Sequence, residues 1–251
     1  MLKPTKGVKR MAFTNVFKRY ELKYLLTTQQ MEELLQRAAS HIKGDEYGKS
    51  TICNIYYDTP DSLLIRRSLD KPMYKEKLRL RSYGIAKENT PVFVEIKKKF
   101  DGVVYKRRIN TSERLATALC KGITPTTQDQ ITKEILYFIR RYDRLEPAVF
   151  LSYDREAFYA EDDGEFRVTF DRNILWRDSD LSLSKGVYGT PILKSNEVLM
   201  EVKCPGAMPL WFVEILTDMK LYKTSFSKYG NAYAAKQRKI IAEKKQQKIS
   251  A

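Results

Sequence analysis

Basic side chains recur at every second position in several segments of this sequence. The clearest is residues 75–81, KEKLRLR, in which every odd position is basic while Leu78 and Leu80 alternate with them. The same apolar and ionic alternation occurs in residues 19–24, 92–99, 165–171 and 198–203. Because successive side chains of a β-strand point to opposite faces, each segment predicts a strand with one dry face and one ionic face. Clustered lysines and arginines of this kind can bind phosphates or other polyanions.

The five ionic faces carry more cations than anions. The basic residues are Arg19, Lys23, Lys75, Lys77, Arg79, Arg81, Lys97, Lys99, Arg167 and Lys203, and the acidic ones are Glu21, Glu95, Glu165, Asp171 and Glu201. Like charges two residues apart on a strand repel each other unless an anion lies among them. Two arrangements fit this pattern: an antiparallel sheet with one solvated face, or a barrel whose ionic face surrounds a polyanionic ligand. The alternation by itself favours neither.

The overall composition is that of a globular protein with a strong positive charge. The 251 residues include 43% hydrophobic residues, and 46 Lys plus Arg against 31 Asp plus Glu give a net charge of +15. Such a chain attracts polyanions, which include nucleic acids, anionic membranes and phosphorylated molecules. No Gly- or Ser-rich linker or repeat interrupts residues 11–235, which predicts one domain there.

Histidine and cysteine usage limits the possible chemistry. His41 is the only histidine, so metal sites and nucleophilic machinery built on histidine are excluded. A catalytic metal would have to be a hard cation held by carboxylates, which indicates Mg²⁺ or Mn²⁺. The three cysteines are widely spaced and suggest neither a disulfide framework nor a thiolate metal site. With no apolar run long enough for a membrane span, we expect a cytoplasmic location.

Helix signals lie between and after the predicted strands. Thr27 and Gln30 match a capping box, and Ser112 is a second candidate cap. Four predicted apolar stripes follow, made of Met31, Leu34, Leu35 and Ala38; Leu115 and Leu119; Ile131, Ile135, Phe138, Ile139 and Tyr142; and Leu210, Val213 and Leu216. We expect residues 1–10 to form a flexible basic N-terminus, and residues 236–251 a basic helix extension or tail.

The order of several motifs identifies a resemblance over residues 17–235. These motifs are RYELKY (19–24), IYYDT (55–59), KLRLRSY (77–83), VFVEIKKK (92–99), SYDREAF (152–158), FRVTFDRNI (166–174), MEVKCPG (200–206) and SFSKYGNAY (225–233). Together they resemble the VTC family of polyphosphate polymerase domains, a branch of the triphosphate tunnel metalloenzymes related to the CYTH proteins. The resemblance implies an α+β fold: an eight-stranded antiparallel β tunnel, closed as a barrel with a polar lumen, with helices outside and a C-terminal helix at one mouth.

The resemblance also implies roles for individual residues. The positions that match the family's phosphate-contacting residues are Lys23, Arg79, Arg81, Lys97, Lys99, Arg155 and Arg167, with Ser227 and Lys228 at the terminal phosphate. Lys75, Lys77 and Lys203 are added as substrate-binding candidates because they share the ionic faces. Glu201 matches the metal-binding glutamate, and Glu21 and Glu95 are further candidates for Mn²⁺ or Mg²⁺.

The implied activity is metal-dependent transfer of the γ-phosphoryl group of ATP to inorganic polyphosphate. A membrane protein that receives the product is a further partner to consider, and no specific nucleic acid is expected. The Glu-x-Glu-x-Lys signature of hydrolytic CYTH members appears here as residues 19–23, RYELK, with arginine in place of the first glutamate. Two alternatives stay open: a triphosphatase on the same fold, and a noncatalytic polyanion-binding module.

Overall fold

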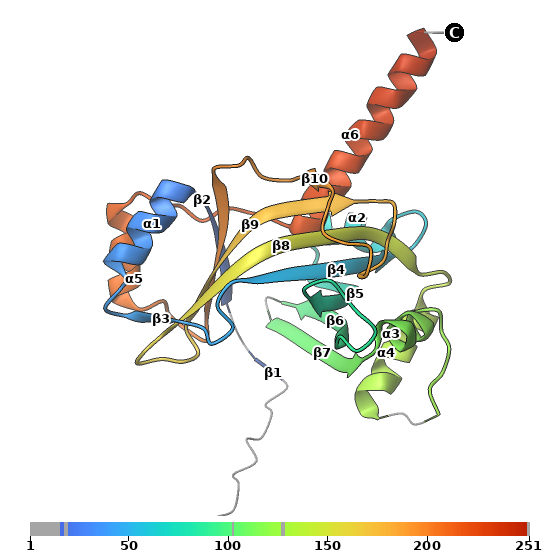
Figure 1. Cartoon of the computed structure of the whole chain (residues 1–251), viewed down its shortest axis with the longest axis horizontal. Helices are drawn as coiled ribbons and strands as arrows, with labels where there is room; N and C mark the ends of the chain where they lie inside the picture. Colours follow the sequence, from blue (N-terminus) through green and yellow to red (C-terminus); the bar gives the residue numbers. More distant parts are fainter. Residues whose placement is uncertain (1–15, 18–19, 102, 127–128, 250–251) are drawn as a thin grey trace, which may run out of the picture.

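A large antiparallel sheet with six helices forms the body of the protein in the computed structural model, which describes residues 16–17, 20–101, 103–126 and 129–249 (Figure 1). The predicted N-terminal segment 1–10 and Arg19 lie outside the described residues. Eight strands are long: β2 (Tyr20–Thr27), β4 (Ser50–Asp58), β5 (Tyr74–Tyr83), β6 (Val92–Phe100), β7 (Val103–Thr111), β8 (Glu146–Ala160), β9 (Arg167–Arg177) and β11 (Glu197–Cys204). Three are short: β1 (Val16–Phe17), β3 (Ile42–Gly44) and β10 (Thr190–Pro191).

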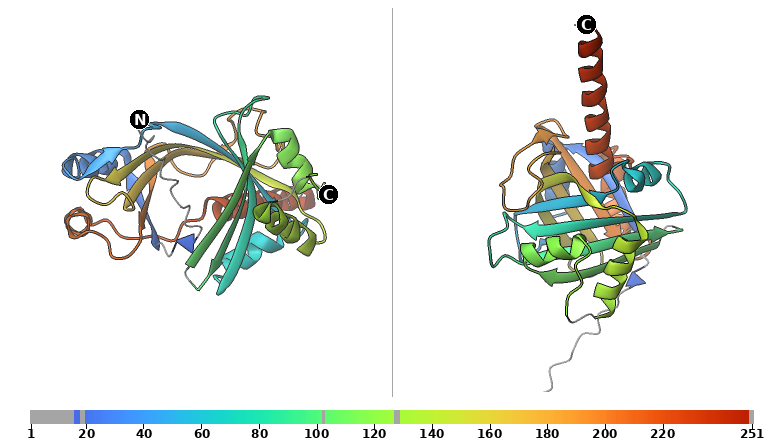
Figure 2. Two further views of the ribbon diagram at one scale, coloured as in Figure 1. Left: turned by 90° about the horizontal axis from the view of Figure 1, so that it is seen from below. Right: turned by 90° about the vertical axis from the view of Figure 1, so that its right-hand side faces the viewer.

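The strands pair in the order β1-β7-β6-β5-β4-β8-β9-β11-β2, with β10 beside β9 and β3 beside β8. The sheet curves strongly and has one concave face (Figure 2). Among the described residues its hydrogen bonds do not close into a ring, and the predicted closed barrel is therefore not confirmed. The free edge of β2 instead meets the segment before the last helix, where Thr224 N donates to the Lys23 carbonyl at 2.7 Å.

Five of the helices cover the sheet or connect its strands. They are α1 (Thr28–Arg37), α2 (Leu63–Leu69), α3 (Glu113–Cys120), α4 (Gln130–Arg141) and α5 (Leu210–Asp218). Helices α3 and α4 lie at one end of the curved sheet, and α1 and α5 lie at the other (Figure 1). Two outer apolar cores result, one around Leu80, Val94 and Phe138, the other around Phe170, Met200 and Phe212. The dry faces of the strands thus point outward under the helices, as the alternation requires.

The predicted caps are present, but two of the predicted apolar stripes are partly wrong. Thr27 Oγ1 accepts from Gln30 N at 3.1 Å, and Ser112 Oγ accepts from Leu115 N at 3.4 Å. Leu115 itself is 55% exposed, and Leu210 of α5 is 78% exposed. Val213 is also exposed, and α5 buries Phe212, Ile215 and Leu216 instead. The short α5 is apolar around most of its surface, so the sequence did not specify which side packs inward.

The last helix, α6 (Lys228–Ile249), differs from the others because its first turns pack on the concave side of the sheet. Tyr229 and Ala232 lie there among Ile52, Tyr153 and Leu199, with α2 beside them. Residues 236–249 continue the same helix, whose C-terminal half projects away from the sheet (Figure 1). Within the described ranges, no helix combines the length and apolarity needed to cross a membrane.

Two leucines provide a test of this assignment of faces. Leu80 is fully buried under α3 and α4, whereas Leu210 is 78% exposed on α5. Leu80→Ala is expected to lower the free energy of unfolding by about 2–5 kcal/mol, because it removes buried methyl groups and leaves a cavity. Leu210→Ala is expected to cost less than about 0.5 kcal/mol. Urea unfolding of both variants checks this, and equal losses would show that the faces are assigned wrongly.

Candidate functional site

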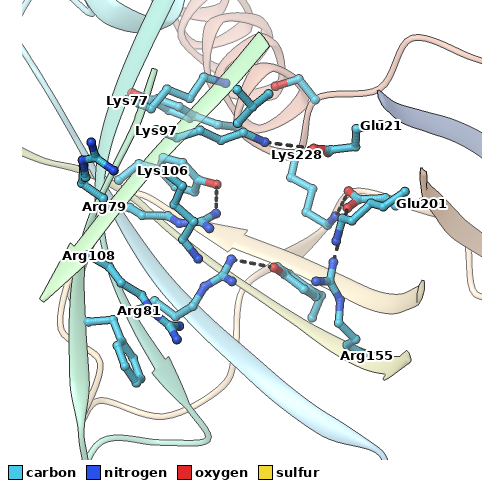
Figure 3. Close-up of a pocket in the computed structure, with 18 of the residues that line it drawn as sticks. Glu21, Lys77, Arg79, Arg81, Lys97, Lys106, Arg108, Arg155, Glu201 and Lys228 are labelled. Atoms are coloured by element: carbon cyan, nitrogen blue, oxygen red, sulfur yellow. Dashed lines mark hydrogen bonds and ion pairs between the residues drawn. The ribbon is translucent and has the colours of Figure 1, made fainter. Parts of the chain in front are cut away.

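A cavity of about 860 Å³ lies on the concave side of the sheet (Figure 3). Its wall has many cations and few carboxylates. The lining residues are Glu21, Lys23, Tyr56, Lys77, Arg79, Arg81, Phe93, Lys97, Val104, Lys106, Arg107, Arg108, Asn110, Ile131, Tyr153, Arg155, Glu201, Lys203, Ser227, Lys228 and Tyr229. The lining residues of β2, β5 and β6 are all odd-numbered, so these strands share one inner surface, as the alternation predicted. This wall is suited to hold a large anion with several charged groups.

Most of the site residues predicted from the sequence come together here, although four do not line the cavity. Glu95 lies behind the wall, with 1% of its surface exposed. Lys75 and Lys99 oppose each other on β5 and β6, nearer the end of the strand pair, and Lys75 Nζ donates to the Ser68 carbonyl at 3.3 Å. Arg167 is exposed at the start of β9, opposite Lys203 in the register.

Glu95 is a buried counter-ion for three basic side chains. Arg79 contacts it through Nε and NH2, each 2.7 Å from Glu95 Oε2, while Lys106 Nζ lies 2.6 Å from Oε1 and Arg81 Nε 3.9 Å from Oε2. Burial alone would raise the pKa of Glu95, but the charges of Arg79, Arg81 and Lys106 outweigh it and hold the pKa below its usual range. In this arrangement the carboxylate fixes cations in place, and its predicted metal role stays a prediction.

Glu201 is the centre of a second ionic cluster on the opposite wall. Lys228 Nζ lies 2.9 Å from Glu201 Oε1, and Arg155 NH2 lies 3.5 Å from Oε2, with Lys203 Nζ at 4.0 Å. Asp171, which is fully buried, adds a bidentate pair with Arg155 at 2.6 and 2.7 Å. Burial opposes ionisation of Glu201, yet Lys228, Lys23 and Arg155 hold its pKa well below the usual range. The cluster keeps both carboxylates charged.

Glu21, on the edge strand β2, contacts a strand on the opposite wall of the cavity. Lys97 Nζ of β6 donates to Glu21 Oε2 of β2 at 3.0 Å, although β2 and β6 are not hydrogen-bonded neighbours. Lys23 Nζ lies 3.7 Å from Glu21 and 3.7 Å from Glu201, and donates to the Phe226 carbonyl at 2.8 Å. The ion pair between Glu21 and Lys97 therefore joins the two walls where backbone pairing does not.

Several lining residues were not among the predicted site residues. Lys106 and Arg108 project inward from β7, whose sequence contains three consecutive basic residues, KRR, so that its alternation is hidden. Arg107, between them, pairs with Glu134 of α4 at 3.2 Å. Lys106 and Arg108 are two residues apart, so they share one face of the strand, and this spacing is the sequence signal that could have identified them. Tyr56 and Tyr153 come from β4 and β8, which are buried on both faces there and so show no clear alternation of apolar and charged residues.

Burial in the wall and the charges of neighbouring cations lower the pKa values of several lysines. Burial and neighbouring positive charges lower the pKa of Lys77 to about 8. Burial also lowers the pKa of Lys106 to about 8, despite Glu95, and that of Lys203 to about 8. Arg79, Lys77 and Arg81 outweigh the effect of burial on Tyr56 and lower its pKa to about 8. The lysine shifts come mainly from burial, to which neighbouring cations add, whereas the shift of Tyr56 comes from the cations beside it.

The carboxylates are the donors that suit a hard cation. Within the part of the chain that the structure describes, no three His, Cys, Asp or Glu side chains form a ready metal cage. Glu21 and Glu201 do come from neighbouring strands, and both lie near Lys23 Nζ. Because Mg²⁺ is commonly held by one or two carboxylates together with phosphate oxygens and water, this donor set fits a cation bound together with a phosphate ligand.

Comparison with known proteins decides the family. A family model described as the VTC domain matches residues 18–236. This chain belongs to the VTC domain family. A search of curated proteins finds no match for this VTC chain.

Solved structures of similar fold are distant in sequence from this VTC chain. A proposed adenylyl cyclase from Hippeastrum, described as having a dominant triphosphatase activity, is 15% identical, with a TM-score of 0.51 over 86% of this chain and 96% of that one. A proposed adenylate cyclase from Vibrio parahaemolyticus is 13% identical, with a TM-score of 0.47 over 86% and 98% of the two chains. At this identity the Hippeastrum likeness concerns the fold alone.

The lowered lysine pKa values predict how anion binding depends on pH. Below about pH 8 these lysines are protonated, and a bound anion raises their pKa, so affinity is lost as the pH rises through 8. Affinity for inorganic tripolyphosphate is expected to fall roughly tenfold or more between about pH 7 and about pH 9.5. Lys106→Arg, which keeps its charge, should reduce this fall. Calorimetric titration at both pH values measures it, and equal wild-type affinities would contradict the assignment.

Proposed function

We propose that this VTC-domain chain is a polyphosphate polymerase, which transfers the γ-phosphoryl group of ATP to a growing polyphosphate chain inside the cavity. The observation that carries the proposal is the wall itself, where lysines and arginines from β2, β5, β6, β7, β8 and β11 face one space with few carboxylates among them. A chain of linked phosphates supplies closely spaced negative charges, which such a wall stabilises along its length. Membership of the VTC family supports the same reading.

The basic side chains have separate tasks in this proposal. Arginines such as Arg79, Arg81 and Arg155 offer planar forks for two phosphate oxygens, and lysines such as Lys97 and Lys203 offer point charges. Their carboxylate partners hold the guanidinium groups before any ligand binds, so that little reorganisation is needed. Phosphoryl transfer mainly requires that donor and acceptor are aligned and that charge on the phosphate oxygens is neutralised.

Proton transfer places few demands on this site. The acceptor would be the terminal phosphate of a chain, which is already anionic, so no general base is required. The single histidine, His41, stacks on Trp211 with ring centroids 4.4 Å apart and is not among the lining residues. The residues around the cavity therefore act by binding and orientation.

In this proposal, Glu201 and Glu21 would hold Mg²⁺ or Mn²⁺ together with phosphate oxygens. When bound, the cation would neutralise charge on those oxygens and help to orient them. The ligands would be ATP and inorganic polyphosphate. We also propose that the protein is cytoplasmic, which its buried free cysteines support, and that it delivers its product to a membrane partner.

A triphosphatase is the second candidate, because Glu21 and Lys23 retain part of the hydrolytic signature and face the same cavity. The Hippeastrum protein of similar fold is described as having a dominant triphosphatase activity. This candidate would release orthophosphate and form no polymer. A noncatalytic polyanion-binding module would bind phosphate chains without turnover.

Replacing Glu201 separates catalysis from binding. Glu201→Gln keeps the shape of the side chain and removes one negative charge from a cationic wall, so affinity for polyphosphate should be kept or increased. The melting temperature should fall, because four cations lose a buried counter-ion. Turnover of ATP that depends on Mn²⁺ should be lost, and extra ATP should not restore it. All three quantities are measured on one preparation.

Glu161→Gln is the matched control. Glu161 pairs with Lys43 at 2.9 Å on the surface, so its variant should change neither affinity nor turnover and barely alter stability. If folded Glu201→Gln protein turns over ATP as the wild type does, Glu201 only balances charge and the proposed metal role is wrong.

A further inference from the structure

Among the basic residues that the structure describes around the cavity, Lys228 comes from a helix, whereas the others project from strands. Its ammonium lies 2.5 Å from Asp171 Oδ2 and 2.9 Å from Glu201 Oε1, and 4.6 Å from the centre of the Tyr153 ring. Only 9% of the side chain is exposed. The place of this charge in the cavity therefore depends on how the first turn of α6 is held.

The next residue, Tyr229, points to a different partner. Its hydroxyl donates to Asp58 Oδ2 at 2.8 Å, and its ring stacks on Tyr56 with centroids 4.9 Å apart. Consecutive side chains on an α-helix diverge by about 100°. Fixing Tyr229 on the side of α2 and Tyr56 consequently fixes the direction in which Lys228 leaves the helix.

Asp58 is a rigid anchor for that contact. Its carboxylate is fully buried at the end of β4, where it accepts from Thr59 N and Leu64 N at 2.8 Å each and from Ile65 N at 2.9 Å. Leu64 and Ile65 belong to the first turn of α2, and Thr59 directly follows Asp58, so the carboxylate cannot move without breaking contacts to the helix and to the chain that leads into it. Burial and the charge of Asp58 raise the pKa of Tyr229, which keeps its hydroxyl a donor.

We propose that Asp58 and Tyr229 are positioning residues, which set the orientation of α6 so that the Lys228 ammonium reaches the phosphate-binding cavity. This inference rests on the proposed function, in which Lys228 contacts the terminal phosphates of the ligand. Asp58 does not line the cavity, and it acts only through Tyr229 and Lys228. Tyr229 does line it, so a direct contact between its hydroxyl and the ligand is the competing explanation.

A double-mutant cycle distinguishes these explanations. Affinity for inorganic tripolyphosphate without metal is measured by calorimetry for the wild type, Tyr229→Phe, Lys228→Met and the double variant. Tyr229→Phe alone should weaken binding roughly threefold to tenfold, because the ammonium loses its fixed position. In the Lys228→Met background the same change should have no further effect.

Tyr233→Phe is the matched control on the next turn of α6. Tyr233 packs against the same inner core as Tyr229 but not against Asp58, and its variant should leave affinity unchanged. Asp58→Asn provides a second perturbation of the anchor should Tyr229→Phe fail to fold, and it should likewise weaken binding only when Lys228 is present.

Two results would overturn the inference. One is a Tyr229→Phe variant with a lower melting temperature but wild-type affinity, which would make the hydroxyl merely structural. The other is an equal loss of affinity with and without Lys228, which would place the hydroxyl on the ligand. If the wild type does not bind tripolyphosphate at all, this result would instead contradict the proposed function, and the inference that rests on it.

Discussion

Mutual repulsion among the inward-facing lysines and arginines is the constraint on which this structure depends. Side chains of like charge on adjacent strands destabilise a sheet unless counter-ions or bound anions lie among them. The protein supplies part of the compensation itself, through carboxylates that lie in the wall or directly behind it. Glu95 pairs with cations of β5 and β7, and Asp171 and Glu201 pair with cations on the opposite wall. The helices outside provide the apolar burial that keeps these strands together.

These carboxylates do not offset the cost of burying charged lysines in the wall. The lysines that face the interior hold their protons less firmly than usual, with pKa values of about 8 for Lys77 and Lys203. An anion that enters would remove this penalty, so binding and protonation are coupled. The ion pair between Glu21 and Lys97 connects β2 and β6 across the same space, and an anionic ligand would compete for Lys97.

Sequence periodicity predicted the strands and helix ends whose local pattern matches the face that the whole fold buries. The strands around Glu21 and Arg79 and the cap at Thr27 follow from alternation and capping rules, because each has one clearly buried face. Periodicity failed where burial is two-sided, as at Tyr56 under α6, and at α5, where Leu210 is exposed. The pairing of charges behind the wall, and the path of the chain along the free edge of β2, depend on long-range contacts that no local pattern contains.

We propose above all that the charged cavity extends a phosphate chain. The most direct measurement incubates the purified protein with ATP and Mn²⁺ and separates the products on a gel stained for polyphosphate. Chain extension predicts a stained polymer that lengthens with time while ADP accumulates and little orthophosphate is released. Stoichiometric orthophosphate with no polymer would contradict the claim and select the triphosphatase. Tight binding of polyphosphate without any ATP turnover would contradict catalysis altogether.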